Sequence, residues 1–333
     1  MFSCEDRNVS TMKPASVGYN ASTYLLTVIG IFANLTVVIV FINCKIYRRS
    51  FTYLLVFQQS IFDMIACFLY PCFHILFSSN GNFANYCKFG TLFFFCLSAS
   101  TLNLVFISVE RYIAVVHPLK YWIRGNQMRS NLPQLCIPLV AAFLITFQYA
   151  FILEEDQEEP GKCTFCYKNK GFEILSGTIL LLANGIIPIS TMTFCYYRVY
   201  ITLKKQNKIQ AELTNQGHIN NASRAINYHN NDELAVEINI SPSQTNQKEK
   251  AKNQRNFIIT MSINTLVFTI CLTPVIGVYL VYTICKCFDI NYHISSDIAT
   301  FFVVFSMVAN PFIYAYKLFD FKEGFSKTFC RQC

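Results

Sequence analysis

Ionisable and amide side chains stand inside otherwise apolar stretches of this sequence. Asp63 lies in SIFDMIACFLYP, and a carboxylate near the centre of a bilayer costs about 2.5–3.5 kcal/mol on insertion scales. Such a group should face polar company inside a helix bundle, which Asn34, Asn103 and Asn310 can supply from other apolar stretches. A lone carboxylate with a purely structural role is the simpler alternative. Enzymatic chemistry is not indicated, because Asp63 has no second acid or His–Asp set at its depth.

A second group of polar residues stands where an apolar stretch ends, in VERYIAVVHPLKY. Glu110-Arg111-Tyr112 puts opposite charges at the expected border of apolar helix and cytoplasm. Arg111 can pair with Glu110 in one state and reach other partners when neighbouring helices separate. The alternative is an interfacial anchor, since Arg and Tyr are common at bilayer edges.

A third group, in MVANPFIYAYKLFD, combines a proline with an amide and a phenol. Pro311 removes a backbone hydrogen bond and predicts a kink, while Asn310 can bind the freed groups or polar neighbours. Tyr314 offers a hydroxyl one turn further on. A short basic amphipathic stretch, KLFDFKEGFSKTF, follows directly.

The elements that must position these residues are membrane-spanning helices. The chain is 53% hydrophobic and 14% charged, whereas soluble domains carry about 25% charged residues. A helix of about 20 apolar residues crosses a bilayer, and seven stretches qualify: 22–43, 51–77, 88–116, 132–153, 172–203, 257–285 and 295–317. The predicted fold is an all-α seven-transmembrane bundle (21–317) with a short amphipathic eighth helix.

The remaining segments are polar. Residues 1–20 are expected to form an extracellular tail, 204–254 a largely disordered third cytoplasmic loop, and 318–333 the amphipathic helix and cytoplasmic tail. Lys and Arg concentrate in alternate loops, which predicts an extracellular N-terminus and a cytoplasmic C-terminus. The net charge of +8 is therefore a matter of topology, and nucleic acid is not an expected partner. Asn8 and Asn20 stand in glycosylation sequons of the tail.

These features together resemble the rhodopsin-like (class A) G-protein-coupled receptors, over residues 20–330. The matching elements in chain order are Asn34, Asp63, Cys87, Glu110-Arg111-Tyr112, Pro188 with Tyr196, Phe268 with Pro274, and Asn310-Pro311-x-x-Tyr314. The resemblance implies a plasma-membrane receptor that activates a heterotrimeric G protein when its sixth helix moves outward. Arrestin and receptor kinases are implied as further partners.

The resemblance also implies roles for individual residues. Glu110-Arg111-Tyr112, Tyr196 and Asn310-Pro311-x-x-Tyr314 would couple the bundle to the G protein. Asp63 with Asn34 and Asn310 would form a sodium-sensitive cluster, with a structural Na⁺ near Asp63. Neither a catalytic residue nor another metal site is expected.

In the family, the cysteine at the position of Cys87 bridges to the second outer loop. That loop offers Cys163 and Cys166 here, and the sequence does not choose between them.

Other cysteines flank the two ends of the bundle. Cys285 and Cys287 can bridge locally or reach Cys4 on the outer side. Cys330 and Cys333, beyond the amphipathic stretch, are candidate palmitoylation sites, with unmodified thiols as the alternative.

The sequence departs from the family pattern in its expected ligand pocket. Phe93 stands where amine receptors carry an aspartate, and the seventh span has no lysine for a retinal Schiff base. The pocket is expected to be aromatic, with Phe93, Phe94 and Tyr279 as candidates.

The predicted packing switch between the pocket and the inner face also departs from the pattern. Pro188, Phe268 and Pro274 are present, but Leu272 replaces the usual tryptophan. Gln254 replaces the acid that locks Arg111 in many relatives, which predicts some ligand-independent signalling.

The predicted function is a non-enzymatic receptor for an extracellular ligand, with a peptide or another non-aminergic ligand favoured. One alternative is a receptor-like protein that serves as a partner or chaperone without G-protein signalling. A small transporter is the other, disfavoured because no inverted repeat is found.

Overall fold

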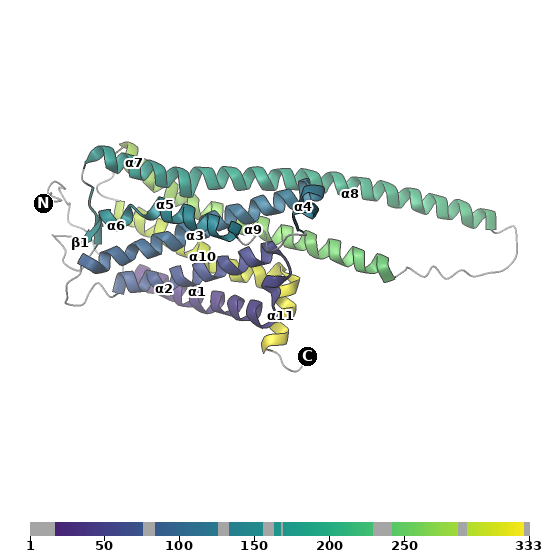
Figure 1. Ribbon diagram of the computed structural model, residues 1–333, viewed down its shortest axis with the longest axis horizontal. Coiled ribbons are helices and arrows are strands. Elements are labelled where there is room, and N and C mark those ends of the chain that lie inside the picture. The colour runs from purple at the N-terminus through teal and green to yellow at the C-terminus, as the bar shows by residue number, and fades with distance from the viewer. Residues whose placement is uncertain are drawn as a thin grey trace.

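The computed structural model describes residues 17–75, 84–125, 133–155, 163–167, 169–228, 242–285 and 292–329. Long helices run roughly alongside one another, with a short β-hairpin at one end and the helices α4 and α11 at the other (Figure 1). All helices long and apolar enough to cross a membrane in the described residues belong to this bundle, and there are seven of them.

The seven spans are built from the following helices. The first three are α1 (Val17–Asn43), α2 (Phe51–Ile75) and α3 (Ala84–Val116). The fourth joins α5 (Cys136–Thr146) to α6 (Tyr149–Ile152), and the fifth joins α7 (Lys170–Leu181), η4 (Leu182–Ile186) and α8 (Ile187–Tyr228). The sixth and seventh are α9 (Pro242–Cys285) and α10 (Tyr292–Lys317). The prediction of a seven-helix bundle is confirmed.

Short elements mark the two ends. At one end β1 (Leu153–Glu155) pairs antiparallel with β2 (Cys163–Phe165). The opposite end carries η1 (Ile46–Arg48), α4 (Pro118–Gly125) and α11 (Phe319–Phe329). The amphipathic stretch after the seventh span is therefore helical, as predicted.

Apolar side chains divide between the bundle interior and its outer surface. The largest buried cluster includes Phe41, Leu55, Ile107 and Met261. Many large apolar side chains are exposed instead, for example Phe32 at 65%. Exposed apolar surface of this extent suits contact with lipid rather than water, so the chain is a multi-pass membrane protein.

The first helix packs closely because of one glycine. A Cβ atom at Gly30 would lie 2.7 Å from Cys67 Sγ on α2 and 2.7 Å from Val308 Cγ2 on α10. Hydrogen at this position lets three helices meet, and this contact brings Asn34, one turn later, against α10.

The inner parts of the fifth and sixth spans differ from the expected disordered loop. Helix α8 continues to Tyr228 and α9 starts at Pro242, and α8 projects beyond the bundle in Figure 1. The physical reason is that a helix already formed in the membrane needs no new nucleus and extends one residue at a time. A prediction from amino-acid composition alone does not include this lower cost of extending an existing helix.

Candidate functional site

A buried polar cluster joins α2, α3 and α10 near the middle of the bundle. Asp63 is 0% exposed. Ser100 Oγ donates to Asp63 Oδ1 over 2.6 Å, and Asn310 Nδ2 donates to Oδ2 over 2.6 Å. Gln59 Nε2 lies 3.3 Å from Oδ1 and 3.2 Å from Oδ2, and also donates to Ser100 Oγ. The predicted neighbour Asn310 is thus on Asp63, together with two residues that the sequence did not single out.

Asn103 lies one step further from the carboxylate. Its Nδ2 donates to Gln59 Oε1 over 3.0 Å and to the backbone oxygen of Leu55 over 2.8 Å. The predicted contact of Asn103 with Asp63 is therefore indirect and passes through Gln59. The signal for Gln59 was present in the sequence, because it stands one helical turn before Asp63 within the same apolar span.

Asn34 takes a different position from the one expected. Its Nδ2 donates to the backbone oxygens of Gly30, over 3.0 Å, and Met307, over 3.2 Å, and the described contacts of Asp63 do not include it. Met307 is four residues before Pro311, which has no N–H to donate to that carbonyl. Asn34 therefore satisfies the backbone group that the proline leaves free.

The two other predicted prolines also lie within helices of the bundle. Pro274 lies inside α9. Pro188 is buried and stands two residues after the π-helical stretch η4, and such wide turns relieve the clash that a proline causes within a helix.

Two of the four predicted packing residues, Phe268 and Leu272, belong to one apolar cluster. Phe268 is buried in the cluster that contains Met192, Ile107 and Tyr314. Leu272 is partly buried and packs against the same cluster. An aliphatic side chain therefore takes part in this packing where a tryptophan was expected.

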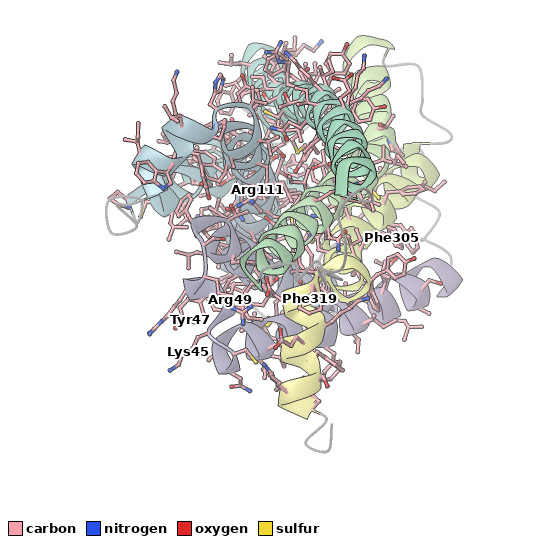
Figure 2. All side chains as sticks on the ribbon, turned by 90° about the vertical axis from the view of Figure 1, so that its right-hand side faces the viewer. Lys45, Tyr47, Arg49, Arg111, Phe305 and Phe319 are labelled. Carbon is pink, nitrogen blue, oxygen red and sulfur yellow. The ribbon has the colours of Figure 1, made fainter. Side chains whose placement is uncertain are left out.

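Arg111 lies toward the end of α3 that adjoins α4, and it is enclosed. It is 8% exposed, and its Nη2 donates to Thr52 Oγ1 on α2. Figure 2, which faces the end of the bundle that carries α11, shows Arg111 among the helices, with Arg49 nearer to Phe319, the first residue of α11. Glu110 is likewise buried, at 7%. Tyr112 turns toward α8, where its ring lies 6.0 Å from Phe194.

Two polar side chains in the bundle lack a hydrogen-bond partner among the described residues. They are the hydroxyl of Tyr314 and the amide of Asn264. The residues come from α10 and α9, and they are 0% and 1% exposed. Buried groups in this condition mark sites that hold water or exchange partners on a change of conformation.

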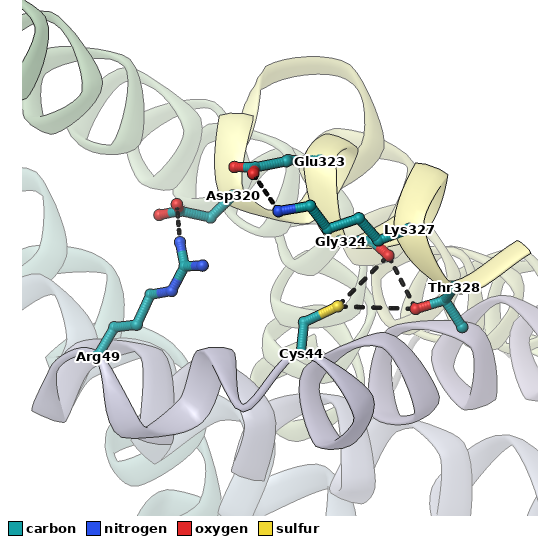
Figure 3. Close-up of polar contacts among 7 residues, drawn as sticks. All are labelled: Cys44, Arg49, Asp320, Glu323, Gly324, Lys327 and Thr328. Atoms are coloured by element: carbon teal, nitrogen blue, oxygen red, sulfur yellow. Dashed lines mark hydrogen bonds and ion pairs between the residues drawn. The ribbon is translucent and has the colours of Figure 1, made fainter. Parts of the chain in front are cut away.

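Polar contacts join α11 to the segment between α1 and α2 (Figure 3). Asp320 accepts from Arg49 Nη1 and from Tyr53 Oη. Cys44 Sγ lies 3.5 Å from the oxygen of Gly324, where a Cβ atom would be 2.9 Å from Val40. Lys327 bonds Glu323 over 2.5 Å and lowers the pKa of that exposed carboxyl.

Aromatic side chains pack at the opposite end of α3, beside the β-hairpin. Phe94 stacks on Tyr149 with ring centroids 4.4 Å apart, and Phe165 of β2 lies 5.8 Å from Phe94. Phe93 points to α2, 5.8 Å from Tyr70, and is 7% exposed. The side chain of Tyr279, the third predicted pocket residue, lies outside the described part of the chain.

Disulfide-bonded cysteines lie at the same end of α3. Cys87 and Cys166 are each disulfide-bonded, and the amide of Cys166 donates to Ile152 oxygen over 2.7 Å.

Other predicted modification and disulfide residues cannot be located. Cys4, Asn8, Cys287, Cys330 and Cys333 lie outside the described residues, as do the side chains of Asn20, Cys163, Gln254 and Cys285.

Comparison with known proteins agrees with this geometry. Residues 16–314 match the family model of the seven-transmembrane receptors of the rhodopsin family. An octopamine receptor beta-2R from Chilo suppressalis is 27% identical over 249 residues, covering 71% of this chain and 60% of the relative. A trace amine-associated receptor 1 from Pan troglodytes is 26% identical over 233 residues, covering 66% and 59%.

A third relative matches a shorter segment. A 5-hydroxytryptamine receptor 1 from Drosophila melanogaster is 36% identical over 110 residues, or 32% of this chain and 18% of the relative. The chain spans about three fifths of the length of the first two relatives. The family model covers most of the chain, and the chain therefore belongs to the rhodopsin family of seven-transmembrane receptors, which are receptors rather than enzymes.

Proposed function

We propose that this chain is a plasma-membrane receptor that transmits binding of an extracellular ligand to a heterotrimeric G protein. The observation that carries the proposal is the environment of Arg111. A guanidinium is enclosed at the inner end of the bundle, with Thr52 as an acceptor from α2, while the Tyr314 hydroxyl and the Asn264 amide have no partners among the described residues.

These groups support a two-state mechanism. In the state described, Arg111 is held inward against α2. An outward movement of α9 opens the inner end, allows Arg111 to contact a G protein, and lets the Tyr314 hydroxyl and the Asn264 amide find partners. The buried polar groups favour this exchange, because their hydrogen-bonding capacity is unused before the movement.

We assign the cytoplasmic face of the bundle from the distribution of its charged residues. Lys45, Arg48 and Arg49 at η1, Lys120 on α4 and Lys322 on α11 lie at one end of the bundle, whereas Glu154 and Glu155 stand in the hairpin at the other. Lys and Arg stay on the cytoplasmic side, so α4 and α11 are cytoplasmic and the N-terminus is extracellular. Arrestin and receptor kinases would act on this same inner face.

The ligand is proposed to be other than an amine, with a peptide favoured. The relatives named above are amine receptors, yet Phe93 is packed on Tyr70 and the only acid in α3 is Glu110 at the inner end. An amine needs a carboxylate in the outer pocket, and Asp63 is already bonded on both oxygens. At the pocket mouth, we propose that Cys87 pairs with Cys166 and ties β2 to α3.

The test is G-protein dissociation measured by energy transfer in cells that express the epitope-tagged full chain. A panel of Gα subtypes is screened first without ligand and then with peptide and amine libraries. We expect a response for at least one Gα subtype, lost in Arg111→Ala at equal surface expression. A response that survives Arg111→Ala, or silence across the panel with the chain at the surface, would contradict the proposal, and silence would favour the non-signalling alternative.

A further inference from the structure

We propose that the amide of Gln59 takes the place of a cation at Asp63, so that the central polar cluster of this receptor is independent of sodium. The resemblance to the family predicts a structural Na⁺ beside Asp63, and that prediction can be tested against the donors present. The inference concerns the stability of the bundle and does not depend on G-protein coupling.

The orientation of the Gln59 amide follows from a backbone group. The oxygen of Leu55 can only accept, so the Asn103 atom 2.8 Å away from it is the donor Nδ2. The same Nδ2 lies 3.0 Å from Gln59 and must meet an acceptor there, which is Oε1. The Nε2 group of Gln59 is therefore directed at Asp63 and Ser100 and presents N–H groups to them.

Both oxygens of Asp63 then have donors. A carboxylate offers about four lone-pair positions. Ser100 donates to Oδ1 and Asn310 donates to Oδ2, and the Gln59 N–H that is not directed at Ser100 is shared between the two oxygens. The carboxylate thus receives hydrogens from three side chains, all of which are buried.

The surroundings of the carboxylate also oppose a metal ion electrostatically. Hard cations are held by oxygen lone pairs, but Gln59 and Asn310 turn N–H groups toward this carboxylate. The hydroxyl of Ser100 gives its hydrogen to Asp63 and receives one from Gln59. A sodium ion would have to displace the Gln59 amide and face the positive ends of these dipoles, so the donor set does not fit the ion.

Gln59 is thus a positioning residue that completes a chain of contacts across three helices. Leu55, Gln59 and Asp63 follow one another at single turns of α2 and receive Asn103, Ser100 and Asn310 from α3 and α10. Removing the amide would leave Asp63 with free lone pairs and a buried negative charge. Sodium could then enter and restore the lost stabilisation.

The experiment measures thermal unfolding of the purified full chain in detergent across a graded series of NaCl. Choline chloride keeps the ionic strength constant, and a fluorescent fusion with size-exclusion detection reports the folded fraction. Wild type is expected to show the same Tm in both salts. Gln59→Leu is expected to unfold at lower temperature in choline and to regain stability in NaCl along a saturating curve.

The size of the gain follows from linkage. At a sodium concentration about one hundred times its Kd, the folded-to-unfolded ratio rises about a hundredfold. The double variant Gln59→Leu with Asp63→Asn should lose the sodium response, because the carboxylate is the proposed ligand. Gln59→Met serves as a second variant of closer shape should the leucine variant fail to fold.

The matched control is Gln58→Leu. Gln58 is the neighbouring glutamine of α2, and its Nε2 donates to Leu135 oxygen over 3.2 Å, away from Asp63. Its loss should leave the chain insensitive to sodium. A saturating sodium response in wild type would overturn the proposal, and so would its absence in both Gln59 variants.

Discussion

Replacing Asn34 with leucine is expected to destabilise the bundle by leaving one backbone carbonyl without a donor. Asn34 Nδ2 donates across the helix interface to the oxygen of Met307 over 3.2 Å, the carbonyl that Pro311 cannot serve. Hydrogen bonds between membrane helices average about 0.6 kcal/mol and reach about 1.7 kcal/mol. An unsatisfied buried group costs about 1–3 kcal/mol. Leucine fills a similar volume, so we expect a loss of about 1–2 kcal/mol without a large cavity.

The cause of this loss can be isolated with a second change. In Pro311→Ala the backbone N–H of residue 311 becomes available to Met307 oxygen. The effect of Asn34→Leu should then fall to about 0.5 kcal/mol or less, since the carbonyl keeps a donor from its own helix. The difference between the two backgrounds is a coupling energy of about 1 kcal/mol, as double-mutant cycles measure it.

The assay is equilibrium unfolding of the purified chain in mixed micelles with increasing SDS, followed by circular dichroism. Thr36→Val is the control on the same helix, because its hydroxyl bonds Phe32 oxygen within α1 and is exposed. Its cost should be small and equal in both backgrounds. An Asn34→Leu effect of the same size with and without Pro311 would refute the assignment of Asn34 to the free carbonyl.

Three further changes test other parts of the structure. Asn264→Leu removes a buried amide with no partner among the described residues. It should therefore raise the stability of the state described by about 1 kcal/mol in the unfolding assay and lower basal signalling in the G-protein dissociation assay. A loss of stability would show that the amide is satisfied. Asp320→Asn weakens the ion pair with Arg49, which is half-exposed. The loss of stability should be no more than about 1 kcal/mol and should be smaller at high salt in the same unfolding assay. A loss that does not depend on salt would count against an ion pair. Leu119→Ala alters a side chain of α4, at the end of the bundle proposed to be cytoplasmic, that is 76% exposed, so stability should change by less than about 0.5 kcal/mol. We expect an exposed apolar side chain at this end to contact the G protein, so coupling should fall about tenfold in potency; unchanged coupling would show that Leu119 makes no such contact.

The sequence predicted the parts of the fold that composition controls. Runs of apolar residues set the seven spans, because a bilayer requires a continuous apolar helix of fixed length. The same reasoning identified Asp63 and Asn310 as neighbours, since buried polar groups in lipid need partners.

Specific partners depended on geometry that the sequence does not contain. Asn34 was expected on Asp63, but the close approach at Gly30 sets it against α10 and the carbonyl freed by Pro311. Gln59 was missed although it stands one turn before Asp63, and its contacts with Ser100 and Asn103 depend on the register of α2 against α3.

The contacts of α11 were missed for a similar reason. Asp320 meets Arg49 and Tyr53 across most of the chain length. No local sequence pattern indicates a contact between residues so far apart. The amphipathic stretch predicted a helix, but it did not predict which part of the bundle that helix packs against.

The most direct measurement of the proposed function uses purified components. The full chain in lipid nanodiscs is mixed with each purified heterotrimeric G protein, and the rate of nucleotide exchange is followed for wild type and Arg111→Ala. Wild type should accelerate exchange on at least one G protein relative to empty nanodiscs, and Arg111→Ala should return the rate to that of empty nanodiscs. Equal rates for wild type and Arg111→Ala would contradict the role of Arg111 in coupling.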